Sequence, residues 1–176
     1  MLFRSAYTGS VSKSLAPGLR LGWMVPPADL FDDLVEAKRF ADLGNAAPDQ
    51  AALADFIRTG RYDRHLRRCQ RTYRDRRDVL RAALAAELPD VRTTGIAAGL
   101  HLIAEFPAEY GSAASIVERA AGKGVRLHPV ADYAIRRGAV PGEEIDAGPT
   151  RIVLGYANLT PRRISAGINA LARALR

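Results

Sequence analysis

The sequence has little cysteine and no long hydrophobic stretch. Its single cysteine, Cys69, excludes an internal disulfide and argues against a cysteine-based metal site. No run of about 18 apolar residues occurs, so no segment is long enough for a membrane-spanning helix. The first residues also lack the apolar stretch of a signal peptide. These absences predict a cytoplasmic protein with no membrane partner and no metal site.

Several motifs that mark catalytic or nucleotide-binding sites are also missing. The three histidines, His65, His101 and His128, are far apart and have no metal-ligand spacing, so each is interpreted as structural. No Gly-x-Gly-x-x-Gly or P-loop pattern occurs. No Gly-x-Ser-x-Gly elbow supports a serine nucleophile. His101 falls in a predicted strand, one face of which could approach a cofactor cleft.

Lysine is scarce too, and one lysine has informative neighbours. Only three of the 26 lysines and arginines are lysines. Lys13 follows Ser10 and Ser12 and precedes a Pro-Gly turn and Arg20. A lysine amine can form a Schiff base with an aldehyde cofactor, while hydroxyls and a guanidinium can hold a phosphate. On Ser-x-Ser-Lys alone, a turn between two strands with an incidental lysine is an equal alternative.

The formal net charge is +7, and much of the positive charge lies in a predicted helix over 61–88. Its arginines are Arg64, Arg67, Arg68, Arg71, Arg74, Arg76, Arg77 and Arg81. Such a basic helix could grip a nucleic-acid backbone. The alternative, which we favour, is a linking helix whose arginines are solvated or paired with Asp63, Asp75 and Asp78 at helical spacing.

Apolar periodicity and turn residues divide the chain into predicted elements. Helices are expected over 28–42, 48–59, 61–88 and 113–122 and from Pro161, with Thr160 as N-cap, to the end. Strands are expected over 19–25 (a buried strand), 91–94, 100–106, 125–130 and 152–156, and a loop over 136–149. The alternation after residue 89 predicts a small α/β unit.

The string from Ser10 to Trp23 reads Ser-Val-Ser-Lys-Ser-Leu-Ala-Pro-Gly-Leu-Arg-Leu-Gly-Trp. It closely resembles the cofactor-lysine segment of pyridoxal-phosphate (PLP) enzymes of the aspartate-aminotransferase fold. The resemblance implies that PLP is the cofactor, that Lys13 is the catalytic residue bonded to its aldehyde, and that Ser10, Ser12 and Arg20 bind its phosphate. It also implies an α/β fold, the C-terminal part of a PLP fold-type-I protein.

Four more segments resemble the MocR-type branch, in which a GntR-like winged-helix DNA-binding domain precedes an aminotransferase-like domain. They are 49–68, 73–78, 98–102 and 154–159, so the similarity covers nearly the whole chain. The resemblance implies that the intact protein contacts DNA only through a winged-helix domain absent from this sequence. It also implies a homodimer.

The resemblance further implies that the chain is a C-terminal fragment. Residues 1–60 would be the end of the PLP-binding large domain, 61–88 a linking helix and 89–176 the small α/β domain. In the family, the preceding half supplies a glycine-serine phosphate loop, a ring-stacking aromatic and an aspartate for the pyridine nitrogen. We therefore expect exposed apolar surface in 1–60, and a chain that by itself holds PLP weakly and is inactive.

One family position is altered. Aminotransferases of this fold usually grip the substrate carboxylate with an arginine on a strand near the C-terminus, and here Val153 holds that position. Arg151 lies two residues earlier, on the same face of the predicted strand, and is the alternative carboxylate ligand.

The sequence leads to two functional hypotheses. The first is a PLP-binding aminotransferase-like domain of a GntR/MocR-type regulator, which transfers an amino group between an amino compound and a keto acid. The second is a non-catalytic domain that senses PLP or an amine and controls DNA binding. Direct nucleic-acid binding by 61–81 is the weakest alternative.

Overall fold

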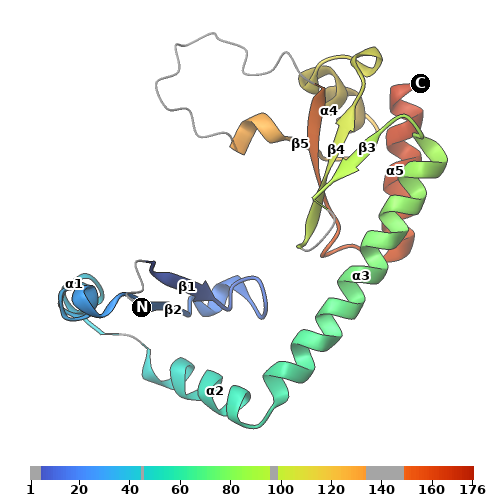
Figure 1. Ribbon diagram of the computed structural model, residues 1–176. Helices are drawn as coiled ribbons and strands as arrows, with labels where there is room; N and C mark the ends of the chain where they lie inside the picture. The colour runs from blue at the N-terminus through green and yellow to red at the C-terminus, as the bar shows by residue number, and fades with distance from the viewer. Residues whose placement is uncertain (1–4, 45, 96–98, 134–148) are drawn as a thin grey trace, which may run out of the picture. The chain divides into compact units, whose positions relative to one another are not determined.

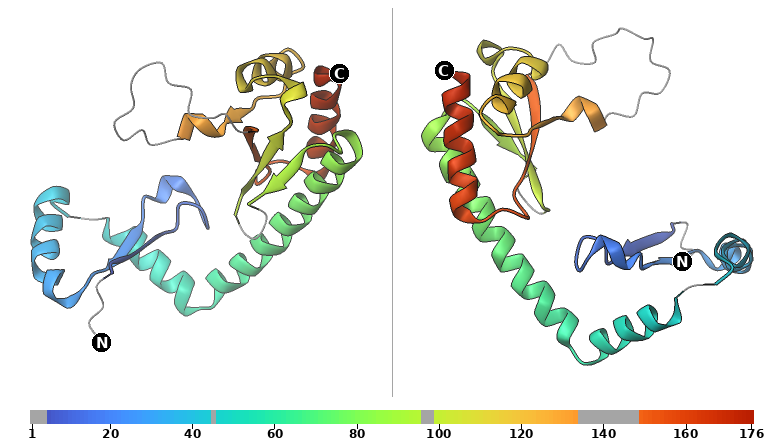
Figure 2. Two further views of the ribbon diagram at one scale, coloured as in Figure 1. Left: turned by 45° about the horizontal axis from the view of Figure 1, so that its top comes forward. Right: turned by 180° about the vertical axis from the view of Figure 1, so that it is seen from behind.

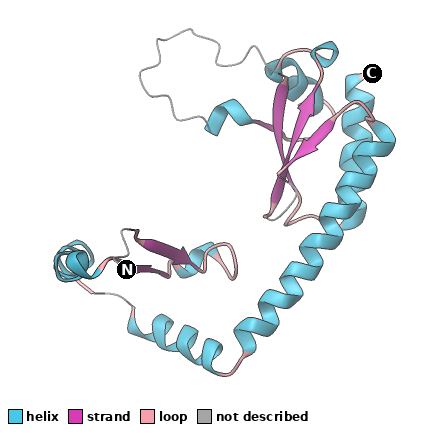
Figure 3. Ribbon diagram, viewed as in Figure 1, coloured by secondary structure: helices cyan, strands magenta, loops and turns pink. Residues whose placement is uncertain are grey.

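The computed structural model describes residues 5–44, 46–95, 99–133 and 149–176 (Figure 1). The chain divides into two compact units, Met1–Cys69 and Gln70–Arg176. Figure 3 shows that both units combine helices and strands. The long helix α3, Arg61–Glu87, contributes its first turns to the first unit and its remaining turns to the second. The domain limits predicted from the sequence stay a prediction.

The first unit contains a two-stranded antiparallel ladder and two short helices. Its elements are β1 (Tyr7–Ser10), β2 (Gly22–Val25), α1 (Phe31–Asp42) and α2 (Ala47–Arg58). Pro17–Leu19 and Ala28–Leu30 form short 3-10 helices. Gly60 follows α2 with a φ of +68°, the left-handed conformation that glycine adopts freely at helix ends.

The second unit is a four-stranded antiparallel sheet with helices on one face (Figures 1 and 2). The order is β3-β4-β6-β5. The strands are β3 (Arg92–Thr94), β4 (His101–Phe106), β5 (His128–Pro129) and β6 (Thr150–Gly155). The helices are α4 (Ala113–Ala121) and α5 (Pro161–Leu175). Figures 1 and 2 show α5 beside the last turns of α3.

The core of the second unit follows from the two-residue period of its strands. Every second residue of β4 and β6 is buried: Leu102, Ala104, Phe106, Ile152 and Leu154. The helices contribute Leu80, Leu84, Ile116, Ala120, Ile164, Ile168 and Leu171 to the same cluster. The intervening residues of β4 and β6 point to the opposite face of the sheet and are exposed or half-buried. That face is therefore less covered than the face that packs against the helices.

The helix starts confirm the capping signals in the sequence. Thr160 accepts a hydrogen bond from the Arg163 amide at 3.3 Å, as its predicted N-cap role requires. Ser112 caps α4 in the same way through the Ser115 amide, also at 3.3 Å.

Two strand predictions need correction. The buried strand predicted over 19–25 is wrong, because β2 begins only at Gly22 and its four residues are all exposed. In the described part of the chain β1 is its single ladder neighbour, and a two-stranded ladder buries little surface. The strand predicted over 125–130 shortens to His128–Pro129, since Pro129 has no amide hydrogen to extend the ladder.

Apolar side chains are exposed along residues 1–60, as expected. They are Tyr7, Leu19, Trp23, Met24, Val25, Leu30, Phe31, Leu34, Val35, Phe40, Leu43 and Ile57. No helix of the described ranges is long and apolar enough to cross a membrane. The loop predicted over 136–149 lies almost wholly outside the described residues.

The arginines of α3 have mixed surroundings. Arg76 donates a hydrogen bond to the Ala157 carbonyl, and Arg77 forms an ion pair with Asp78 at 2.9 Å. The others are exposed: Arg61, Arg64, Arg67, Arg68, Arg71, Arg74 and Arg81. The Arg77–Asp78 pair joins adjacent residues and not residues at helical spacing, and exposed arginines fit both a solvated helix and a basic surface, so both interpretations stay open.

Tyr156 links β6 to the turn before β4. Its side chain is 2% exposed, and its hydroxyl donates to the Gly99 carbonyl at 3.0 Å. Burial raises the pKa of this phenol above its usual value, against a lowering by Arg77, while Asp78 adds to the increase. A raised pKa in the folded state means that the stability contributed by the neutral phenol is present below about pH 10. That contribution is lost as the pH rises through the folded-state value.

We therefore predict that Tyr156→Phe lowers the free energy of unfolding by about 1 kcal/mol at neutral pH. The variant should also lose less stability than the wild type above about pH 10. Urea unfolding followed by circular dichroism across this range measures both effects. Tyr133→Phe, at a side chain that is 64% exposed, is the matched control. Equal alkaline loss in wild type and Tyr156→Phe would contradict the role given to Tyr156.

Candidate functional site

Lys13 lies in a tight turn that continues directly from β1. The Val11 amide donates to the Leu21 carbonyl at 3.1 Å, which extends the β1–β2 ladder by one residue. The Leu15 amide then donates to the Val11 carbonyl at 2.8 Å and closes a single helical turn around Lys13. We call residues Val11 to Leu15 the lysine turn.

The ladder register brings the predicted phosphate ligands to the same end as Lys13. Ser10 is paired with Gly22, and the Val11–Leu21 hydrogen bond keeps this register. Ser12 and Lys13 follow in the turn after β1, and Arg20 lies two residues before β2. The four residues predicted to bind the cofactor thus lie in or next to the same end of the ladder.

The four side chains present donors that have no partner among the described residues. Ser10, Lys13 and Arg20 are exposed and Ser12 is half-buried. None of them makes a side-chain hydrogen bond or ion pair with the part of the chain that the structure describes. Two hydroxyls, a guanidinium and an amine are donors suited to phosphate oxygens and an aldehyde. The residues present therefore fit a phosphorylated aldehyde.

Arg20 has an uncommon backbone conformation. Its φ of 51° lies in the left-handed region, at the end of the 3-10 helix Pro17–Leu19. A residue with a Cβ pays about 1–2 kcal/mol for this conformation. Such conformations are concentrated at functional sites, and here the conformation belongs to the predicted phosphate arginine.

Sequence reasoning missed three residues that hold the lysine turn. Ser14 is hydrogen-bonded to Tyr62 and His65, both in the first turns of α3. The available signal was the spacing of Tyr62 and His65, which puts them on one face of a helix. Nothing in the sequence indicates that this face contacts a residue about fifty positions earlier.

The second unit holds the predicted substrate arginine. Arg151 is on the open face of the sheet, where its Nε donates to the Glu105 carboxylate at 3.1 Å. Val153 shares this face and lies between Ile103 and His128 in the ladder. Arg151 is thus already paired with an acid, while the family's arginine position is apolar. Its carboxylate-binding role stays a prediction.

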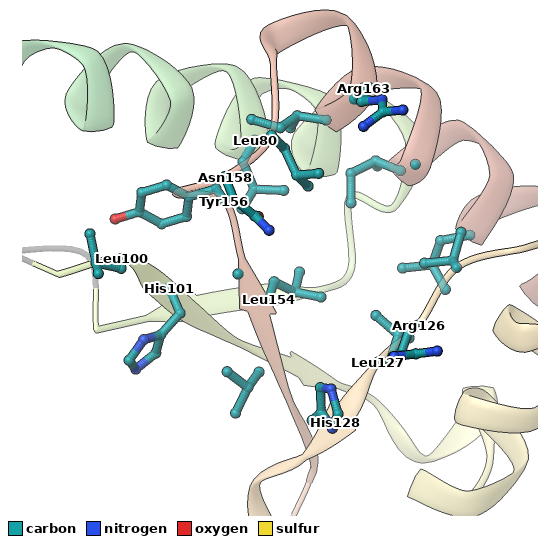
Figure 4. Close-up of a pocket in the computed structure, with 18 of the residues that line it drawn as sticks. Leu80, Leu100, His101, Arg126, Leu127, His128, Leu154, Tyr156, Asn158 and Arg163 are labelled. Carbon is teal, nitrogen blue, oxygen red and sulfur yellow. The ribbon is translucent and has the colours of Figure 1, made fainter. Parts of the chain in front are cut away.

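A cleft of about 700 Å³ opens beside β6 in the second unit (Figure 4). Its apolar wall includes Leu80, Leu154 and Leu171, and four basic side chains lie along it: His101, Arg126, His128 and Arg163. All four are exposed. His101 thus lines a cleft, but no contact in the described residues gives it a chemical role. Within the described ranges, no group of three or more potential ligands could hold a metal ion.

Comparison with known proteins identifies the family. Residues 4–171 match the model of the aminotransferase class I and II family. The chain belongs to this family.

Curated relatives include transcriptional regulators, as the resemblance to the MocR-type branch implied. The chain is 34% identical over 174 residues to the uncharacterized HTH-type transcriptional regulator YhdI of Bacillus subtilis, covering 97% of this chain and 34% of the relative. It is 34% identical over 176 residues to the probable rhizopine catabolism regulatory protein MocR of Rhizobium meliloti, with 97% and 33% covered. The chain thus spans about a third of the length of these relatives.

Solved aminotransferases share the fold. LysN, the α-aminoadipate aminotransferase of Thermus thermophilus, matches with a TM-score of 0.79 and 30% identity over 97% of this chain and 41% of its own. The kynurenine aminotransferase of Pyrococcus horikoshii matches with a TM-score of 0.82 and 27% identity, covering 98% and 40%. The predicted fold class, part of a fold-type-I aminotransferase, is confirmed.

Gly9 allows Trp23 to lie against the strand that leads to the lysine turn. The two residues are paired in the ladder, and a Cβ at Gly9 would come within 2.4 Å of Trp23 Cζ2. Gly9→Ala should therefore displace the indole and destabilise the ladder by about 1–3 kcal/mol. Trp23 is the only tryptophan, so its fluorescence spectrum measures the displacement.

Gly18→Ala is the control for this substitution, because a Cβ at Gly18 would meet no atom within 4 Å. An emission spectrum that changes in Gly9→Ala and not in Gly18→Ala is the expected result. Identical spectra for wild type and Gly9→Ala would show that the indole does not lie over Gly9.

Proposed function

We propose that this chain is the cofactor-lysine part of a PLP-dependent aminotransferase-like protein. Lys13 holds the aldehyde of PLP, and Ser10, Ser12 and Arg20 hold its phosphate. The observation that carries the proposal is that these four residues lie in or next to one end of the β1–β2 ladder, with no side-chain partner among the described residues. The solved structure of LysN supports the cofactor, since that protein was crystallised with N-(5'-phosphopyridoxyl)-L-leucine.

The chain's own residues have separable tasks in this proposal. Arg20 offers a planar pair of donors that keeps its charge at any physiological pH. Ser10 and Ser12 add neutral donors that direct the phosphate to one place. The neutral amine of Lys13 moves the proton at the substrate α-carbon. Bound PLP supplies an electron sink for that carbon.

The intact protein is proposed to transfer an amino group between an amino compound and a keto acid. Arg151 is proposed to bind the substrate carboxylate, for which it would have to exchange its partner Glu105. We also propose a cytoplasmic homodimer that contacts DNA through a winged-helix domain outside this sequence. The regulators among the relatives support the DNA-binding part of this proposal.

A non-catalytic effector domain is the second candidate. One observation favours it, the match to transcriptional regulators over 97% of the chain, and so does the expectation that Val153 holds the family's substrate-arginine position. In this alternative, binding of PLP or its adduct with an amine shifts the protein between two DNA-binding states.

The cofactor assignment predicts selective labelling of one lysine. Incubation with PLP, reduction with borohydride and peptide mass spectrometry should show the label at Lys13 in preference to Lys38 and Lys123. The preference should fall about tenfold in Arg20→Ala, because a charge-assisted hydrogen bond is lost. Pyridoxal, which has no phosphate, should show no such preference. Without reduction, dialysis should remove PLP from this chain.

Arg39→Ala, at an exposed arginine of α1, is the control for the loss of one positive charge. An even distribution of PLP over the three lysines would refute the assignment of Lys13. A preference for Lys13 that is equal with PLP and pyridoxal would refute the phosphate role of Ser10, Ser12 and Arg20.

The protein extended by its winged-helix domain separates the two candidate functions. The aminotransferase proposal predicts steady keto-acid production that Lys13→Ala abolishes. The effector alternative predicts amine-dependent DNA binding, measured by fluorescence anisotropy, with no turnover. Turnover without any change in DNA affinity would exclude the effector alternative.

A further inference from the structure

We propose that Tyr62 and His65 are positioning residues for Lys13, acting through Ser14. This inference rests on the proposed role of Lys13 as the cofactor lysine. Ser14 directly follows Lys13 and carries no assigned role in cofactor binding. Its hydroxyl and its carbonyl are both hydrogen-bonded to residues of α3. Two hydrogen bonds therefore fix the residue next to Lys13.

The two contacts are short and come from a single helix face. Ser14 Oγ lies 2.9 Å from Tyr62 Oη, and Ser14 O lies 2.7 Å from His65 Nε2. Tyr62 and His65 are three residues apart in α3, which places them on the same face. Ser14, Tyr62 and His65 are all half-buried, so water competes less for these hydrogen bonds than at the exposed Lys13.

The carbonyl contact determines the hydrogen position on His65. A carbonyl oxygen can only accept, so His65 Nε2 must carry the hydrogen that it donates to Ser14. The same nitrogen lies 3.3 Å from Cys69 Sγ, one helical turn further along α3. Because Nε2 donates its hydrogen to Ser14, that atom cannot act as a base. We therefore assign His65 the role of positioning the lysine turn.

Aromatic packing supports the pair from the side of α2. The ring of Phe56 lies 6.1 Å from the ring of Tyr62 at 57° and 6.4 Å from that of His65 at 50°. These distances fall in the range of tilted aromatic contacts. Phe56 therefore limits the rotation of both rings and keeps their polar atoms directed at Ser14.

The lysine turn is fixed at its other end as well. Val11 is 1% exposed, and its carbonyl accepts the Leu15 amide at 2.8 Å. The backbone on both sides of Lys13 is thus held, while its exposed side chain makes no hydrogen bond or ion pair with the described residues. Such an arrangement leaves the amine free to react and fixes its starting point relative to Ser12 and Arg20. Correct placement of a reactive group raises its effective concentration.

The test measures the position of Lys13 relative to the phosphate ligands separately from the folding of the chain. The chain is labelled either with PLP or with pyridoxal, reduced with borohydride and digested. Mass spectrometry then gives the label at Lys13 relative to Lys38 and Lys123. Loss of placement changes the PLP preference, because only PLP must reach Lys13 and the phosphate ligands together. A general loosening of the unit changes labelling by both reagents.

Tyr62→Phe and His65→Leu should each lower the PLP preference for Lys13 about fivefold to tenfold, the effect of one lost hydrogen bond. Pyridoxal labelling should not change. His65→Gln should restore the PLP preference, because its amide can donate to Ser14 O. Tyr133→Phe, in the second unit, is the control. Tyr62→Phe keeps the ring and decides the question by itself if circular dichroism shows that His65→Leu does not fold.

The outcomes distinguish this inference from the proposed function. A wild-type chain without PLP preference at Lys13 refutes the proposed function and, with it, the positioning role. A wild-type preference that persists in both Tyr62→Phe and His65→Leu refutes the positioning role alone. Parallel changes with PLP and pyridoxal would also overturn it, since they indicate a purely structural contact.

Discussion

The buried side chain of Val11 is the anchor on which the lysine site depends. It is the one buried side chain among the described residues of Met1–Cys69, and both backbone groups of Val11 are hydrogen-bonded. The amide continues the β1–β2 ladder, and the carbonyl closes the turn around Lys13. A single apolar residue therefore connects the β1–β2 ladder to the turn that carries Lys13. Loss of that anchor would separate the two.

The two units of the chain are stabilised very differently. The second has a continuous core in which Phe106, Ile116, Ile152 and Leu171 are fully buried. Most of the stabilisation from burial of apolar surface is therefore in this unit. The first unit depends on hydrogen bonds and on the aromatic contacts of Phe56. The reactive lysine thus belongs to the unit with little core, where local contacts such as that of Ser14 with α3 have a larger share in defining the geometry.

Local signals in the sequence predicted most of the helices and strands. The Thr160 cap and the alternation of β4 and β6 depend on neighbours within a few residues, so the sequence pattern was sufficient. The four residues predicted to bind the cofactor lie within one short segment, so a resemblance could single them out together, and their roles stay a prediction. The contact of Ser14 with His65 was not predictable, because 51 residues separate the two and only the fold brings them together. Burial of β2 was predicted wrongly, because hydrophobic character indicates what a strand can bury and not whether a covering layer is present.

Arg20 combines a cationic side chain with an unfavourable backbone conformation, and this has a consequence for how the site can change. Glycine would adopt the φ of 51° without strain, so the backbone alone favours replacement of the arginine. The proposed phosphate role of Arg20 would set selection for anion binding against selection for stability at this position. A glycine at the same position in a relative would indicate that this position no longer contributes to phosphate binding there.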